Sequence, residues 1–107
     1  MRLRRIAYRT SAREDLRAIG RWFNVRVSRE FATSYLQRIR GRIDTLSYGS
    51  ERGRQRSDLR KGLRIVSIMK SITVAFVVTD DTVIILRVFY GGQDWERALS
   101  TDEEQDD

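Results

Sequence analysis

The fold is decided by residues 63–90, which read LRIVSIMKSITVAFVVTDDTVIILRVFY. This stretch holds three apolar runs rich in Val, Ile and Thr, separated by polar breaks at Lys70 and Ser71 and at Asp80 and Asp81. Runs of β-branched residues joined by two-residue breaks are typical of consecutive antiparallel hairpins. The sequence therefore predicts a three-stranded antiparallel meander over residues 63–69, 72–79 and 82–90.

Side chains alternate between the two faces of a strand, so the sequence also predicts which residues share a face. Both faces of the predicted meander are largely apolar, which indicates that other parts of the chain cover its middle strand on both sides. The alternation places Ile65, Phe76 and Ile85 on one face, and Val66, Ala75 and Leu86 on the other.

Two amphipathic helices are predicted before the meander. In the first, apolar residues recur at intervals of three and four over residues 12–23, and Ser11 with Glu14 has the pattern of a capping box. The second helix is predicted over residues 29–46, with an apolar stripe from Ala32 to Leu46 and Ser28 as the N-cap. Because only a short break joins the two helices, we expect an antiparallel hairpin that packs on the sheet.

The flanking segments complete one domain. Residues 3–9 alternate imperfectly and predict a short first strand at one side of the sheet. After the meander, one helical turn is expected at residues 94–99, with Asp94 as its N-cap. We therefore expect a single α+β domain at residues 1–100, followed by a disordered acidic tail at residues 101–107.

The composition excludes several kinds of chemistry. The chain contains neither cysteine nor histidine, which removes disulfides, thiol nucleophiles, imidazole bases and the commonest metal ligands. We expect no metal site and no cofactor. The chain has no apolar run of the roughly 18 residues that a membrane span needs, and its start does not suit a signal peptide. A cytoplasmic protein without membrane partners is expected.

Positive charge is concentrated in the first part of the chain. Residues 1–64 carry 18 basic and 6 acidic side chains, whereas residues 65–107 carry 3 and 9. Arginine supplies 19 of the 21 basic side chains, and its planar fork favours carboxylate or phosphate partners. Residues 52–64 set six cations against Asp58. Such a loop predicts either an anion-binding site or a docking surface for an acidic protein, and the sequence leaves both open.

Two motifs carry a resemblance to a known family. They are GRQRSDLRKGLR at residues 53–64 and LRVFYGGQD at residues 86–94, and they follow the predicted strand and helix hairpin in order. On these motifs the chain resembles the RelE/ParE superfamily of bacterial toxins over residues 4–99, and is more similar to its ParE branch. The resemblance implies a small α+β toxin in which a helical hairpin packs on a twisted antiparallel β-meander.

The resemblance also implies partners. A cognate ParD-like antitoxin is expected to wrap the toxin with an extended C-terminal segment in a hetero-oligomer, so that the toxin meets DNA only indirectly. ParE-like members inhibit DNA gyrase by binding to it, whereas RelE-like members are endoribonucleases that cut mRNA on the ribosome. A family member that binds its antitoxin but has lost toxicity is a third alternative.

The residues favour the gyrase-binding branch. RNA cleavage needs a base, an acid and cations that converge on one phosphate, and RelE-like toxins use basic residues and a late tyrosine for this work. Arg64 matches one such arginine, but Gly92 and Gln93 stand where a basic pair is expected. Ala98 or Leu99 stands where the late tyrosine is expected.

The predicted register supports the same reading. With two-residue turns, Arg64 lies level with Val77 and Ile84. Arg87 lies level with Ser67 and Val74, which puts the two arginines on opposite faces of the sheet. They are therefore not expected to converge on one phosphate.

We expect binding residues rather than a catalytic set. Arg87 is predicted to be a structural anchor, whereas a functional and a structural role are equally open for Arg64. Trp22 and Trp95 lie off the main apolar stripe, as interface anchors often do, although half-buried packing is as common. Phe31 is predicted to belong to the core. The candidate target- or antitoxin-binding residues are Arg54, Arg56, Arg60, Arg64, Tyr90, Trp95 and Trp22.

Overall fold

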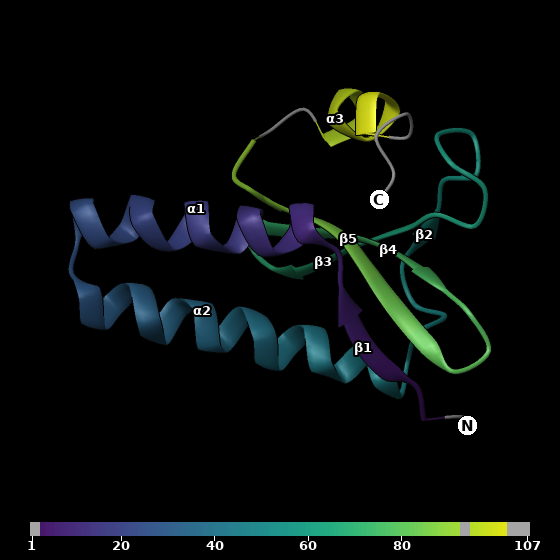
Figure 1. Ribbon diagram of the computed structural model, residues 1–107, viewed down its shortest axis with the longest axis horizontal. Helices are drawn as coiled ribbons and strands as arrows, with labels where there is room; N and C mark the ends of the chain where they lie inside the picture. Colours follow the sequence, from purple (N-terminus) through teal and green to yellow (C-terminus); the bar gives the residue numbers. More distant parts are fainter. Residues whose placement is uncertain (1–2, 93–94, 103–107) are drawn as a thin grey trace.

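The computed structural model describes residues 3–92 and 95–102 and has an α+β fold (Figure 1). Five strands form one sheet in the order β1-β5-β4-β3-β2. The strands are β1 (Arg5–Tyr8), β2 (Arg54–Gln55), β3 (Arg64–Met69), β4 (Ile72–Val78) and β5 (Thr82–Tyr90). The helices are α1 (Thr10–Arg26), α2 (Arg29–Asp44), the 3-10 helix η1 (Thr45–Ser47) and α3 (Trp95–Asp102).

The predicted meander is confirmed. Strands β3, β4 and β5 pair in antiparallel order, and their ends lie within one residue of the prediction. Strand β1 pairs in parallel with β5 and forms one edge of the sheet, as expected for a first strand at its side. Strand β2 forms the other edge by pairing with β3. The sequence predicted only a loop at β2, because two residues are too few to show an alternation.

Two β-bulges change the register within the meander. One lies in β3 at Ile68, and the other lies in β5 at Leu86; each residue has no partner in the facing strand. A bulge shifts all pairs beyond it by one position, so it changes which residues lie side by side. The two-residue turns themselves are as predicted, because Met69 lies opposite Ile72 on either side of the first break.

The predicted faces of β3 are wrong as a result. The sequence placed Ile65 with Phe76, but beyond the bulge Ile65 lies opposite Ala75 instead. Val66 correspondingly packs in the core that contains Phe76. One face of the sheet thus holds Ile65, Ala75 and Leu86, and the other holds Val66, Phe76 and Ile85.

The predicted capping box at the start of α1 is also wrong. The helix begins at Thr10 with Arg9 as N-cap, and no side chain caps it. The Ser11 hydroxyl instead donates a hydrogen bond of 3.1 Å to the carbonyl oxygen of Leu86. The chain passes directly from β1 into α1, so Ser11 already lies in the first turn, beside the bulge of β5.

The second helix follows its prediction closely. The Ser28 hydroxyl accepts a hydrogen bond of 3.0 Å from the Phe31 amide, which confirms Ser28 as N-cap. Helix α2 ends at Asp44, and η1 carries the apolar stripe onward to the buried Leu46. Its buried face is made by Ala32, Ile39 and Ile43.

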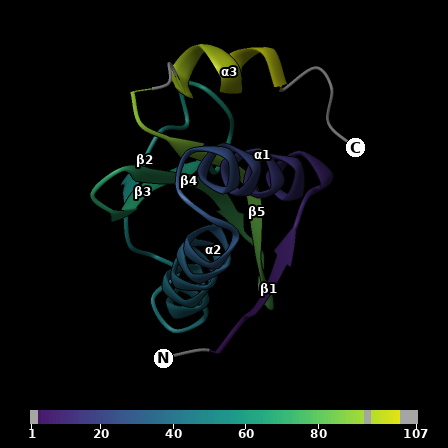
Figure 2. The ribbon, with the colours of Figure 1, turned by 90° about the vertical axis from the view of Figure 1, so that its left-hand side faces the viewer.

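The sheet is covered on both faces, as the apolar strands predicted. The larger core lies between the sheet and the hairpin of α1 and α2, where Ile39 and Phe76 are fully buried. The smaller core lies on the other face, where Leu99 of α3 is buried with Leu63 and Phe89. Figure 2 looks along the hairpin and shows α3 apart from it.

The end of the chain differs from the prediction in one respect. Helix α3 is longer than the single turn expected, and it reaches Asp102, inside the predicted tail. Residues 103–107 and the predicted N-cap Asp94 lie outside the described residues. None of the described helices is long and apolar enough to cross a membrane. Within the same residues, no three acidic side chains gather as metal ligands would.

Candidate functional site

The structure divides the predicted binding residues between separate places. Trp22 and Tyr90 come together beside α1, with their ring centroids 5.5 Å apart. Arg54, Arg56 and Trp95 come together at α3, where the two guanidinium groups lie 5.9 and 5.5 Å from the Trp95 ring. The predicted residues therefore do not form one site.

A groove of about 230 Å³ lies between α1 and the end of β5. Trp22 is 41% exposed, although it is one of the largest apolar side chains in the protein. An open groove with aromatic walls and a few polar groups is typical of a binding site for an apolar side chain. Its lining residues are Asp15, Ala18, Ile19, Trp22, Val88 and Tyr90.

An aromatic cluster supports this groove from within the hairpin. The buried Phe23 ring lies 4.9 Å from Trp22, 5.4 Å from Tyr90 and 4.7 Å from Tyr35. Phe31 joins the cluster at 5.1 Å but is 39% exposed, so its predicted place in the core is wrong. It follows the N-cap of α2 by three residues, at the turn of the hairpin. Burial raises the pKa of the Tyr35 phenol, and the neighbouring Tyr90 raises it further.

An ion pair fixes the polar end of the groove. Asp15 accepts hydrogen bonds from Arg87 Nε at 2.7 Å and Nη2 at 3.0 Å, and one from the Val88 amide at 2.9 Å. Both charged side chains are mostly buried, at 16% and 17% exposure. Arg87 is thus the structural anchor that the sequence predicted, and it holds α1 against the edge of β5.

Arg56 holds the basic loop against α3. Its guanidinium donates two hydrogen bonds to Asp58, at 2.9 and 2.8 Å, and one to Glu96 of α3 at 2.5 Å. The bonds to Asp58 and Glu96 raise the pKa of Arg56. The same guanidinium lowers the pKa of Asp58 below its ordinary value. The loop was predicted to be either an anion-binding site or a docking surface for an acidic protein, and in the structure its Arg56 binds carboxylates of its own chain.

Other arginines of this loop are also engaged. Arg52 donates to the carbonyl oxygens of Gly49 and Thr45, at 3.1 and 3.0 Å. Arg64 donates to the carbonyl oxygen of Glu51 at 2.7 Å. Arg60 is half-buried in the turn that leads to β3. Several cations of residues 52–64 therefore bind backbone carbonyl groups or carboxylates of this chain and stabilise the loop.

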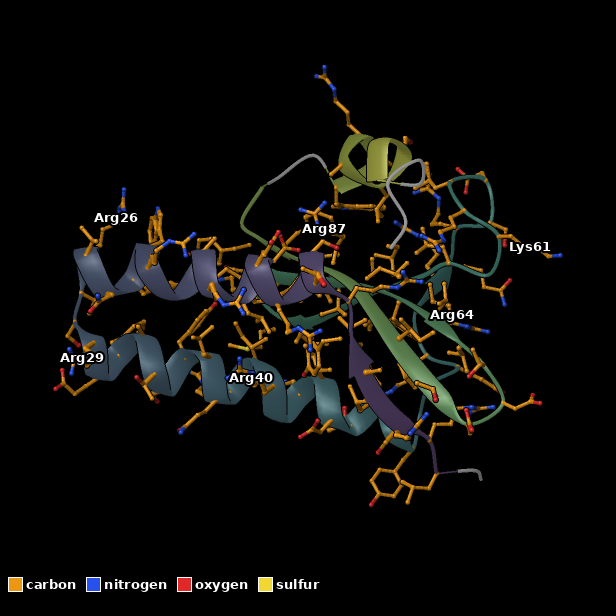
Figure 3. All side chains as sticks on the ribbon, viewed as in Figure 1. Arg26, Arg29, Arg40, Lys61, Arg64 and Arg87 are labelled. Carbon is orange, nitrogen blue, oxygen red and sulfur yellow. The ribbon has the colours of Figure 1, made fainter. Side chains whose placement is uncertain are left out.

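Arg64 and Arg87 lie on opposite faces of the sheet, as predicted. Their rows differ from the prediction by one position because of the bulges: Arg64 lies opposite Phe76, and Arg87 lies opposite Ala75. Figure 3 shows Arg87 beside α1 and Arg64 well apart from it, toward the basic loop. The two guanidinium groups thus do not meet on one phosphate.

The sequence of residues 6–95 matches the family model of the ParE toxin of type II toxin-antitoxin system, parDE. The chain belongs to the ParE toxin family.

Solved structures agree with this ParE fold. The chain is similar to one from the chromosomal ParDE toxin-antitoxin system of P. aeruginosa, with 22% identity and a TM-score of 0.72 over 83% of this chain and 97% of that one. It is also similar to a chain of the E. coli DinJ-YafQ toxin-antitoxin complex, with 14% identity and a TM-score of 0.54 over 82% and 92%. A search of curated protein sequences finds no match.

Two features of this ParE-family chain were not predicted from its sequence. Asp15 was not recognised as the partner of Arg87, because the two are 72 positions apart and meet only after a bulge. The exposure of Phe31 was also missed, since an aromatic residue near an apolar stripe is ordinarily buried. Its place three residues after the N-cap Ser28 was the available signal, because that position lies at the turn of the hairpin.

Proposed function

We propose that this ParE-family toxin inhibits DNA gyrase by binding to it, without a catalytic site of its own, and that a cognate antitoxin neutralises it in the cytoplasm. The observation that carries the proposal is the separation of Arg64 from Arg87. Arg64 donates a hydrogen bond to the carbonyl oxygen of Glu51, whereas Arg87 donates to the carboxylate of Asp15. An RNA-cleaving site needs such groups to converge on one phosphate, so the endoribonuclease alternative is disfavoured.

The groove beside α1 is the proposed docking site of the antitoxin. Partially exposed tryptophan and tyrosine in a preformed groove are the residues that most often dominate protein–protein affinity. Trp22 is held by Phe23 and by the Arg26 guanidinium, which lies 4.4 Å above its ring. This support keeps the exposed ring in place, so binding an apolar side chain of the antitoxin would require little rearrangement.

A supercoiling assay tests the proposal. Purified toxin is expected to block supercoiling of relaxed plasmid by gyrase, and addition of the cognate antitoxin is expected to restore it. Unaffected gyrase together with mRNA cleavage in a translating extract would support the endoribonuclease alternative instead. If expression of the toxin is harmless to bacteria and gyrase is unaffected, the chain is a non-toxic antitoxin-binding member.

A further inference from the structure

A row of three exposed arginines lies along α1. Arg13, Arg17 and Arg21 follow one another at intervals of four residues, so they share one side of the helix. With a rise of about 1.5 Å per residue, the row extends over about 12 Å. Like charges four residues apart destabilise a helix, so the row has an energetic cost that the fold itself does not offset.

These arginines have no partner within the described part of the chain. None of the three guanidinium groups forms a hydrogen bond, ion pair or ring contact there, in contrast to Arg52 and Arg56 of the basic loop. Of the two acids in α1, Asp15 is bound to Arg87 and Glu14 points to solvent.

The facing helix α2 adds two further exposed arginines. Arg29 and Arg40 of α2 are exposed and likewise have no ion pair among the described residues. Figure 3 shows Arg29 at the start of α2 and Arg40 along it. Among the described residues, the hairpin thus carries a group of exposed arginines without ion pairs, whereas several arginines of the basic loop are bound to other parts of the chain.

We propose that the arginine row of α1 binds the phosphate backbone of duplex DNA directly. The guanidinium fork suits phosphate oxygens, and the spacing of about 6 Å between successive arginines is close to two base-pair steps of about 3.4 Å. The row, about 12 Å long, therefore presents three guanidinium groups that can each contact one phosphate of the duplex. The choice of DNA as the source of phosphate rests on the proposed function, since gyrase holds duplex DNA.

An acidic protein suits the row less well than DNA does. Protein interfaces are built around a desolvated apolar or aromatic centre with charges at the rim. The row has no such centre, because Trp22 lies about 100° around the helix from Arg21 and belongs to the groove. The groove and the row are therefore separate surfaces of α1, and one molecule of toxin can present both.

The experiment measures binding of the purified toxin to a labelled 20-base-pair DNA duplex by fluorescence anisotropy between 50 and 200 mM salt. The variant is Arg13→Gln/Arg17→Gln/Arg21→Gln. A control, Lys61→Gln/Lys70→Gln/Arg97→Gln, removes the same charge from exposed positions outside the hairpin. Each lost phosphate contact lowers the salt slope by about 1, so the variant should lose about 3 and the control little. At about 0.9 per phosphate contact the slope difference is about 2.7, so over this fourfold salt range wild-type affinity should fall about 40-fold more than that of the variant.

Four outcomes would overturn the inference: no binding of wild type at 50 mM salt, equal salt slopes for wild type and variant, a matching loss in the control, or tighter binding of duplex RNA or poly-glutamate than of DNA. Glutamine keeps a high helix propensity, and unchanged melting temperatures establish that the variants fold. If DNA is not bound but gyrase is still inhibited, this inference fails and the proposed function stands. If DNA is bound through the row but gyrase is unaffected, the proposed function fails and this inference stands.

Discussion

At the scale of single residues, the pair of Asp15 and Arg87 determines how the hairpin meets the sheet. The bulge at Leu86 brings Arg87 level with Ala75, and β1 pairs with β5 only as far as Ile85. Beyond that point Asp15 takes the role of a strand partner, because it accepts the amide of Val88 as well as the guanidinium. The bulge at Leu86, the end of β1 and the ion pair of Asp15 with Arg87 therefore together fix how α1 contacts β5.

Replacement of Asp15 by Asn tests this role. The change leaves the mostly buried Arg87 without a counter-charge, so the free energy of unfolding should fall by about 3 kcal/mol. Urea denaturation measures this value. The neighbouring Glu14→Gln is the matched control, because Glu14 is exposed, and it should change stability by less than about 0.5 kcal/mol. Equal effects of the two substitutions would mean that the pair contributes nothing.

At the scale of elements, the sequence predicted what depends on local pattern and missed what depends on distant contacts. The boundaries of β3, β4 and β5 and the start of α2 follow from periodicity and from Ser28, so they were predicted well, whereas α1 begins and ends outside its predicted stripe. The faces of β3 were mispredicted because a bulge at Ile68 leaves no mark in an apolar strand. The cations of residues 52–64 were predicted to form one binding loop. The sequence contains no sign that Arg56 pairs with Glu96, which is 40 positions away.

The packing of α3 should depend most on Leu99, which is more deeply buried than Trp95 and Ala98 of the same helix. Leu99 is 3% exposed and packs in the core that contains Leu63 and Phe89. Leu99→Ala should therefore lower the free energy of unfolding by about 2–3 kcal/mol, measured by urea denaturation. Val25→Ala is the control, since Val25 is 80% exposed and should show almost no change. A neutral Leu99→Ala would mean that α3 does not close the second core.

At the scale of the whole molecule, the toxin has two surfaces with different chemistry on one hairpin. The aromatic groove lies where α1 meets β5, and the row of Arg13, Arg17 and Arg21 occupies another side of the same helix. The basic loop lies apart from both and is bound to α3 by Arg56. Partner binding is thus expected on the hairpin, although the densest charge in the sequence lies in the loop.

Trp22→Ala tests the groove as the antitoxin site. Loss of a central tryptophan anchor should weaken the complex at least tenfold, measured by calorimetric titration with the cognate antitoxin. Tyr48→Ala is the matched control, because Tyr48 is an aromatic residue of 61% exposure that lies away from the groove. If both variants bind as wild type does, the antitoxin uses another surface.

The most direct test of binding without catalysis compares two reactions of the same purified chain. Incubation with gyrase, ATP and plasmid should produce linear DNA with covalently attached gyrase, and a translating extract should retain intact mRNA. Ribosome-dependent cleavage of mRNA that disappears in Arg64→Ala or Tyr90→Phe, with gyrase unaffected, would contradict the account.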